Sequence, residues 1–324
     1  MSGFDNFYNK FLHSGSTLHT FRVITSSLSS TTLRHAQSLR PVPAKVSTVC
    51  YNSQTMSVEL RSGLETARLL KQDPGKYLSR VKGLYLLSLA DCELGKVARA
   101  SYFSLKSIDD ALDGDRFDID NPLRYALDVR SQVVSGEFVE GSWTSELAEY
   151  SIRGLERRAK SGDNPRNDFL ASIDTMIFDY ERSQDRRILS AEELDNYYLQ
   201  TFTPVLNLMF IGLESRLRAV DVPELAYTQG RVYSVRDIVD DWSRGTINIP
   251  VEVLSAASLS STSTLQEVQS SPVIIEWFSE QLFQSKKDIE GLDRKLNALG
   301  EWITIKTCDG LMRPMRKFID RQLS

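Results

Sequence analysis

Two segments of the chain carry carboxylates at helical spacing. "SLKSIDDALDGD" (104–115) holds Asp109, Asp110 and Asp113, and "VRDIVDDWSRGTINIP" (235–250) holds Asp237 and Asp241. Residues four apart share one face of a helix, so each segment presents a pair of like charges that repel by a few tenths of a kcal/mol. We therefore expect a cation to lie between the carboxylates.

The chain favours a hard cation at these positions. Its three histidines, His13, His19 and His35, all precede residue 36, so imidazole cannot supply a metal ligand in the body of the protein. A metal held by oxygen alone is typically Mg²⁺, which keeps several waters and is usually completed by substrate phosphates. The predicted metal ligands are Asp109, Asp110, Asp113, Asp237 and Asp241.

Basic residues accompany both segments and indicate what the metal would hold. Lys106 precedes the first aspartates, and Arg236 and Arg244 flank the second set. Carboxylates that bind Mg²⁺ beside cations that bind phosphate oxygens suit a diphosphate. The chain has neither a P-loop nor a G-x-G-x-x-G motif, so the diphosphate is better read as a leaving group than as part of a nucleotide. For one cluster alone, a solvated helix face is the alternative.

Composition excludes several other classes. The net charge of −4 gives no reason to expect nucleic acid as a partner. No run of 18 apolar residues is present, so no spanning helix is expected. Cys50, Cys92 and Cys308 are odd in number and far apart, which favours neither a disulfide framework nor a zinc site.

The elements that must position these side chains are predicted to be helices. Apolar residues recur at helical spacing over 57–70, 97–112, 121–134, 142–159, 166–182 and 190–202, and strand signals are nearly absent. Gly95 is read as the break before the helix that carries the first aspartates. We predict one all-α domain over 56–324.

Residues 1–55 are predicted to be a separate basic leader. From Asn6 to Val58 there is no Asp or Glu, and the stretch is rich in Ser and Thr. Such a composition is typical of a plastid or mitochondrial transit peptide. A disordered tail of a cytoplasmic protein, and a true start at Met56, are the alternatives.

The two aspartate segments together resemble motifs of the squalene/phytoene synthase family. "YFSLKSIDDALD" (102–113) is similar to the family's first aspartate motif, and "VRDIVDDWSRGTINIPVEVL" (235–254) is similar to the second, with Arg-Asp, Asp, Arg-Gly, Pro, Glu and Leu in register. The resemblance covers residues 96–254. It implies the all-α isoprenoid-synthase helical fold, with both motifs facing a central cavity.

The resemblance also implies an activity: Mg²⁺-dependent, head-to-head condensation of two allylic prenyl diphosphates (C15 or C20) through a cyclopropylcarbinyl diphosphate. The implied metal-binding and catalytic residues include Asp109, Asp113, Asp237 and Asp241, and the implied diphosphate contacts are Lys106, Arg236 and Arg244. The cavity needs an aromatic lining to shield a carbocation. Tyr102, Phe103, Tyr198, Phe202 and Phe210 are candidates, with core packing as the alternative for each. An apolar product implies contact with a membrane surface.

Three departures from the family pattern lie near the second motif. Gly230 and Tyr233 stand where the family usually has Gln and Asn, and "YLQTFTPVLN" (198–207) replaces small residues and introduces Pro204. We expect Tyr233 to line the substrate site and to reshape it. The departures favour an altered reaction, in which a divergent relative ionises a single prenyl diphosphate. A non-catalytic assembly factor is the third reading, although it predicts decayed aspartates.

Overall fold

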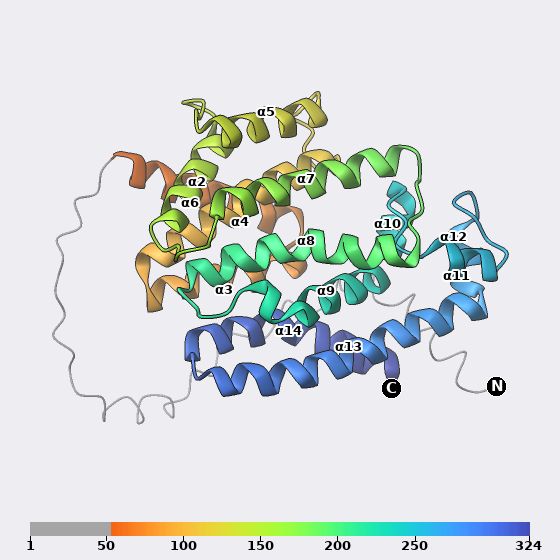
Figure 1. Ribbon diagram of the computed structural model, residues 1–324. Coiled ribbons are helices and arrows are strands. Elements are labelled where there is room, and N and C mark those ends of the chain that lie inside the picture. The colour runs from red at the N-terminus through yellow and green to blue at the C-terminus, as the bar shows by residue number, and fades with distance from the viewer. Residues whose placement is uncertain (1–52) are drawn as a thin grey trace, which may run out of the picture. The chain divides into compact units, whose positions relative to one another are not determined.

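A computed structural model describes residues 53–324 of the protein, and the helices of this part are shown in Figure 1. Side chains are described from Val58 onward, apart from Lys76 and Ser79. Residues 1–52, which hold most of the predicted leader, lie outside the described part. The prediction of a leader over 1–55 therefore stays a prediction.

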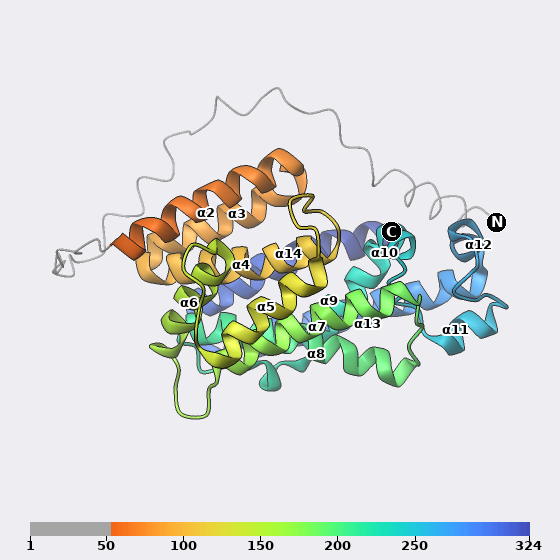
Figure 2. The same cartoon turned by 90° about the horizontal axis from the view of Figure 1, so that it is seen from above.

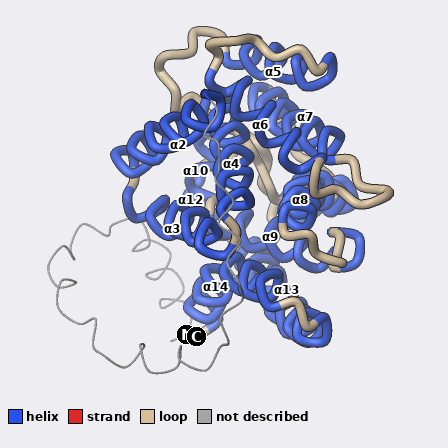
Figure 3. Tube along the Cα trace, turned by 90° about the vertical axis from the view of Figure 1, so that its left-hand side faces the viewer, coloured by secondary structure: helices blue, strands red, loops and turns tan. Residues whose placement is uncertain are grey.

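The regular elements of residues 53–324 are all helical, which confirms the predicted all-α class; Figure 3 shows no strand in this part of the chain. In chain order they are α2 (Ser53–Gln72), α3 (Pro74–Ala90), α4 (Cys92–Leu112), α5 (Pro122–Ser135), α6 (Trp143–Glu156), α7 (Pro165–Gln184), α8 (Ala191–Gly212), the 3₁₀ helix η2 (Ala219–Asp221), α9 (Pro223–Arg236), α10 (Ile238–Arg244), α11 (Val251–Ala256), α12 (Leu265–Ser270), α13 (Pro272–Leu299) and α14 (Trp302–Leu323).

Local sequence explains where several of these helices begin. The Asn121 side chain accepts the backbone N–H of Arg124, and Pro122 opens α5 at a position where its missing N–H has no partner to lose. Ser190 and Glu193 form a reciprocal capping box at the start of α8. The start of α7 has the same Asn-Pro signature as that of α5.

Helix α4 is the centre of the packing, because it contacts α3, α5, α6, α7 and α8. Its buried face includes Phe103 and Ile108, both fully buried. Gly95 does not break the chain before this helix, as its sequence suggested, but lies inside the first turn. A Cβ there would come within 1.9 Å of the Ser88 hydroxyl oxygen, so this glycine lets α3 and α4 approach closely.

Helix α8 continues through Pro204, although proline removes one hydrogen bond of a helix interior. The carbonyl oxygen of Gln200, which Pro204 cannot bond, accepts the hydroxyl of Thr175 from α7 at 3.3 Å. Helices α7 and α8 pack side by side, as Figures 1 and 2 show. The neighbouring helix thus satisfies the carbonyl that the proline leaves without an intrahelical donor.

Helix α9 lies between α8 and the C-terminal pair α13 and α14, which also contact each other. It ends at Arg236, and α10 begins at Ile238, so Asp237 occupies the break between the two helices. Among the described helices, none has the length and apolar character needed to cross a membrane.

Candidate active site

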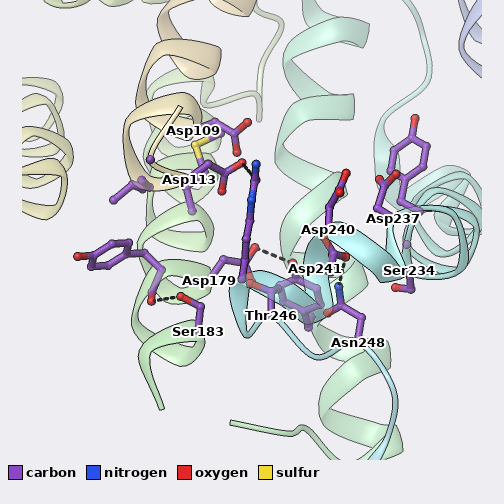
Figure 4. Close-up of a pocket in the computed structure, with 18 of the residues that line it drawn as sticks. Asp109, Asp113, Asp179, Ser183, Ser234, Asp237, Asp240, Asp241, Thr246 and Asn248 are labelled. Carbon is purple, nitrogen blue, oxygen red and sulfur yellow. Dashed lines mark hydrogen bonds and ion pairs between the residues drawn. The ribbon is translucent and has the colours of Figure 1, made fainter. Parts of the chain in front are cut away.

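A cavity of about 610 Å³ is formed by residues of α3, α4, α5, α7, α8, α9 and α10 and of the segments after α4 and α10 (Figure 4). Its volume lies within the range of about 300–1,000 Å³ that is usual for small-molecule sites. The charged and amide side chains of its lining are Arg80, Lys106, Asp109, Asp113, Asp179, Gln184, Arg236, Asp237, Asp240, Asp241, Arg244 and Asn248.

One wall of the cavity is the C-terminal end of α4. Asp109 and Asp113 lie one turn apart on it, and Lys106 Nζ donates to Asp109 Oδ2 at 2.6 Å. Arg244 reaches across from α10, and its Nη1 donates to Asp113 Oδ2 at 2.7 Å. Burial, and then the charge of Asp109, raise the pKa of Asp113 to about 7 in spite of Arg244. Burial of this wall therefore disfavours the charged form of Asp113 even with Arg244 and Lys106 nearby.

The opposite wall is formed by Asp237, Asp240 and Asp241 at the junction of α9 and α10 (Figure 4). Two guanidinium nitrogens of Arg236 donate to the neighbouring Asp237, Nη2 to Oδ2 at 2.5 Å and Nε to Oδ1 at 2.7 Å. Burial, and then the charge of Asp237, raise the pKa of Asp241 to about 8. Two of the most strongly perturbed carboxylates in the described residues thus face one cavity, which is typical of a functional site.

The Arg-Gly pair of the second segment has a structural role at this wall. Gly245 ends α10 with φ of 89°, a left-handed conformation that favours glycine. A Cβ at Gly245 would lie 2.4 Å from the Ser183 carbonyl oxygen of α7. The glycine therefore lets the end of α10 rest against α7, which keeps Arg244 and Asp241 beside the cavity.

A chain of hydrogen bonds that sequence reasoning missed fixes Asp241. The buried Arg182 donates to Asp179 Oδ1 at 2.8 Å and to Asn248 Oδ1 at 2.6 Å. Asn248 Nδ2 in turn donates to Asp241 Oδ2 at 3.0 Å. The Tyr197 hydroxyl donates to Asp179 Oδ2 at 2.6 Å. The only sequence signal was the i,i+3 pairing of Asp179 and Arg182 on α7, which many solvated helices also show.

Aromatic side chains of α8 and α9 form a further part of the lining. The rings of Phe202 and Tyr233 meet edge to face with centroids 5.8 Å apart, and the Arg236 guanidinium lies 4.2 Å from the Tyr233 centroid. Tyr198 is buried, with its hydroxyl 2.9 Å from the Ser234 oxygen. A Cβ at Gly230 would lie 2.2 Å from the Tyr198 ring, so the glycine makes room for this tyrosine.

The structure brings most of the predicted site residues together. Those that line the one cavity are Asp109, Asp113, Asp237, Asp241, Lys106, Arg236, Arg244, Tyr198, Phe202 and Tyr233. Their convergence from segments more than a hundred residues apart in the chain is the feature that the two sequence motifs anticipated. Tyr197, which adjoins Tyr198, was not anticipated, although its hydroxyl is the one that contacts a cavity carboxylate.

Asp110 is placed differently from its prediction as a metal ligand. Its side chain is fully buried and pairs with Arg68 of α2, and its Oδ1 lies 2.5 Å from Lys106 Nζ, an ion-pair distance without hydrogen-bond geometry. Asp110 does not belong to the cavity lining. On a helix, a residue next to Asp109 points about 100° away from it, and at Asp110 that direction leads to Arg68 of α2 instead of to the cavity. We therefore assign Asp110 to the ion pair.

Three predicted aromatic positions also lie outside the lining. Tyr102 packs with Phe103 in the cluster between α2, α3, α4 and α6, with ring centroids 5.4 Å apart. Phe103 and Phe210 are fully buried in the core. For these three positions the core-packing alternative is the correct one, because the helix faces that carry them point into neighbouring helices.

The donor set fits Mg²⁺ held jointly with a ligand. Among the described residues, no three His, Cys, Asp or Glu side chains converge closely enough to hold a metal ion by themselves. A dedicated cage is not needed for Mg²⁺, which is usually bound through one or two carboxylates together with waters and phosphate oxygens. Carboxylates on two facing walls, two of them with raised pKa, match such a shared site.

Comparison with known proteins assigns the chain to a family. A family model described as squalene/phytoene synthase matches residues 88–300, which is more than half of the chain. The matched range includes every aspartate of both walls. No curated protein and no solved structure matches the chain.

Proposed function

Because the chain belongs to the squalene/phytoene synthase family, whose reaction is head-to-head condensation, we propose that it is a Mg²⁺-dependent prenyltransferase that joins two allylic prenyl diphosphates of C15 or C20 length. The observation that supports this best is the charge pattern of the cavity. Carboxylates face each other from two walls, and Lys106, Arg236 and Arg244 lie among them.

Asp109 and Asp113 on one wall, and Asp237 and Asp241 on the other, are the residues that would hold Mg²⁺. The bound metal would neutralise the leaving diphosphate as the allylic C–O bond breaks. Asn248 would keep the Asp241 carboxylate oriented, because its amide donates to Oδ2.

The three cations have a second task in this proposal. Lys106, Arg236 and Arg244 each contact a carboxylate of the cavity. When those carboxylates turn to a metal ion, the cations become available to phosphate oxygens, and arginine can bind two oxygens at once. The proposed site therefore exchanges protein ion pairs for contacts to the diphosphate.

The formation of the new carbon–carbon bonds would take place beside the aromatic side chains of α8 and α9 that line the cavity. Loss of diphosphate with the bonding electron pair leaves an allylic cation, which the double bond of the second substrate attacks. Loss of one proton then gives the cyclopropylcarbinyl diphosphate. The rings of Phe202 and Tyr233 could stabilise the positive charge through their π-faces and exclude water.

A second candidate function is ionisation and cyclisation of a single prenyl diphosphate. This function is supported by the bulky side chains on the part of the lining formed by α8 and α9. There, Phe202 and Tyr233 pack together, and Tyr198 occupies the space next to Gly230. Bulky groups in that region would leave less room for a second prenyl chain. A non-catalytic role in assembly has less support, because both walls keep their carboxylates.

The test of the proposal is the release of inorganic diphosphate by the full chain. With Mg²⁺ and C15 or C20 prenyl diphosphate, we expect release that stops in EDTA and stops in Asp237→Asn. Asp128→Asn, which changes an exposed carboxylate of α5 paired with Arg124, is the matched control and should behave as wild type. A folded protein that releases nothing from any prenyl diphosphate would contradict the proposal.

An apolar product also leads us to propose peripheral contact with a membrane surface. On α3, the exposed leucines Leu78, Leu86 and Leu89 lie along one side of the helix, and Leu89 is 82% exposed. Cosedimentation with vesicles of neutral and anionic lipid would test this contact. Binding to neither vesicle, or binding that persists unchanged when Leu86 and Leu89 become Ser, would contradict it.

The location of the protein in the cell remains a proposal that rests on residues 1–55. We propose that this basic leader directs the chain to a plastid or mitochondrion, and that a chain starting at Met56 keeps full turnover. Import of a fluorescent protein that carries residues 1–55 into plastids or mitochondria would test this proposed targeting. A cytoplasmic fluorescent signal would favour the disordered-tail or Met56-start alternative.

A further inference from the structure

A chain of ion pairs connects the cavity to α2, a helix that lies outside the range matched by the family model. Lys106 Nζ lies 2.6 Å from Asp109 Oδ2 at the cavity and 2.5 Å from Oδ1 of the buried Asp110. The other oxygen of Asp110 accepts Nη2 of Arg68 from α2. Glu65, one turn earlier on α2, accepts Nε of Arg68 at 2.8 Å. Charged groups of alternating sign therefore lead from α2 to the cavity.

Lys106 is shared between two carboxylates that differ in their access to water. Asp109 lines the cavity and is partly exposed, whereas the side chain of Asp110 is fully buried. A buried carboxylate needs cationic partners, because water cannot stabilise its charge. Asp110 has two such partners, Arg68 and Lys106. If Arg68 were absent, Lys106 would be the remaining counter-charge of Asp110 and would be held away from the cavity.

The packing of α2 fixes the position of Arg68. Leu69, the next residue, is fully buried in an apolar cluster that joins α2 to α3, α4 and α6. This burial sets the rotation of α2 and places the guanidinium of Arg68 beside Asp110 of α4. Arg68 does not line the cavity itself. It can therefore influence the site only through Asp110 and Lys106.

We propose that Arg68 is a positioning residue of the site: it neutralises Asp110 from α2 and thereby leaves the charge of Lys106 to the cavity. The proposal deepens the function proposed above and rests on it for the identity of the anion that Lys106 meets. It assigns opposite effects to the two members of one ion pair. Arg68 favours binding of an anion at Lys106, and Asp110 competes with that anion.

The test measures the affinity of the full chain for inorganic diphosphate with Mg²⁺ by titration calorimetry, at a temperature where a thermal melt shows each variant folded. Arg68→Gln should bind more weakly by about 5-fold or more, the lower end of the coupling between separate sites, because Asp110 then draws Lys106 away. Asp110→Asn should bind more tightly than wild type, because Lys106 loses its buried competitor. The double variant, which keeps a hydrogen-bonding pair without either charge, should bind more tightly than Arg68→Gln.

Arg61→Gln is the matched control. Arg61 lies two turns before Arg68 on the same face of α2, and the two side chains are similarly exposed, at 21% and 27%. Arg61 pairs with Glu146 of α6 at 2.7 Å, and neither residue lines the cavity. The control removes an equal charge and an equal link between helices, so it should bind diphosphate as wild type does.

A merely structural role of the ion pair predicts weaker binding in both single variants. Weaker or unchanged binding by Asp110→Asn, unchanged binding by Arg68→Gln, an equal loss in Arg61→Gln, or no binding by the wild type would each overturn the proposal. Either single variant suffices if the other does not fold. Turnover of prenyl diphosphates separates this inference from the proposed function. Opposite shifts in affinity without turnover would reject only the reaction, and turnover with equal affinities would reject only the role of Arg68.

Discussion

The two carboxylate walls use the same residue type but are held in place by different means. The α4 wall is an uninterrupted helix, and its support is ionic. The buried Asp110 joins Lys106 to Arg68 of α2. The α10 wall follows a helix break at Asp237, and its support is a hydrogen-bonded chain from Asp241 through Asn248 to Arg182.

This difference separates three roles of aspartate within one site. Asp109 and Asp237 contact cations at the cavity surface and are 39% and 35% exposed, so they can change partners. Asp110 is fully buried and cannot. Asp241 lies between these cases, because it opens to the cavity but is held by Asn248. The role of each carboxylate follows from its burial and neighbours more than from its place in a motif.

The largest effect is expected from the surface carboxylates of either wall. Asp109→Asn and Asp237→Asn should each lower turnover by about 100-fold or more, comparable to the loss of one group that stabilises a transition-state charge. The melting temperature should change little, because both side chains are partly exposed. Steady-state kinetics and thermal melts measure the two quantities. Wild-type turnover in both variants, or full activity in EDTA, would contradict the proposed role of Mg²⁺.

A large loss of stability is expected from the buried support of the α4 wall. Asp110→Asn leaves Arg68 and Lys106 without a fully buried partner, and breaking such a pair lowers the free energy of unfolding by about 3 kcal/mol. Urea denaturation measures this quantity. A change below about 0.5 kcal/mol, the usual range for surface substitutions, would show that the ion pair does not support the wall.

The opposite sign is expected for Asp241. Its raised pKa of about 8 means that the folded protein holds a proton which the unfolded chain, with a pKa of about 3.9, has released at neutral pH. Stability should therefore fall as the pH rises from about 4 to 8, and Asp241→Asn should stabilise the protein at pH 8 by on the order of 1 kcal/mol. Unfolding in EDTA at pH 5 and pH 8 tests this. Equal or lower stability of the variant at pH 8 would mean that Asn248 fully offsets the burial of Asp241.

A change in product, with a modest loss of stability, is expected from Tyr233. It precedes Asp237 by one turn, as Leu105 precedes Asp109, but Leu105 is core and Tyr233 lines the cavity. Loss of its contacts with Phe202 and Arg236 in Tyr233→Asn should destabilise the protein by about 1–2 kcal/mol. The product distribution or preferred chain length should change more clearly. A lower melting temperature with unaltered products would show that Tyr233 only packs.

The sequence predicted the all-α fold and the convergence of both motifs on a cavity because helical periodicity and i,i+4 spacing are local properties. It could not show which of Asp109 and Asp110 lines the cavity, because Asp110 is turned to the ion pair by Arg68, 42 residues earlier in the chain. The sequence showed that Gly230 departs from the family pattern, but it did not show why a glycine is needed there. The Tyr198 ring fills the space that a larger side chain at residue 230 would need, and this coupling exists only in the packed structure.

Hydrogen bonds between different helices and loops, which hold the cavity carboxylates in place, could likewise not be predicted from local sequence patterns. Asn248 lies in a loop, and Arg182 reaches it from α7 across 66 residues of sequence. Arg68 has no motif around it and is identified only by its ion pair with Asp110.

The most direct measurement of the central claim is the mass of the product. The full chain is incubated with Mg²⁺ and an equal mixture of unlabelled and deuterated prenyl diphosphate, separately for C10, C15 and C20 chains. Head-to-head condensation predicts a product of two prenyl units for at least one chain length, with unlabelled, singly labelled and doubly labelled forms. A product that contains a single prenyl unit, labelled or unlabelled but never mixed, would contradict condensation and favour ionisation of one substrate.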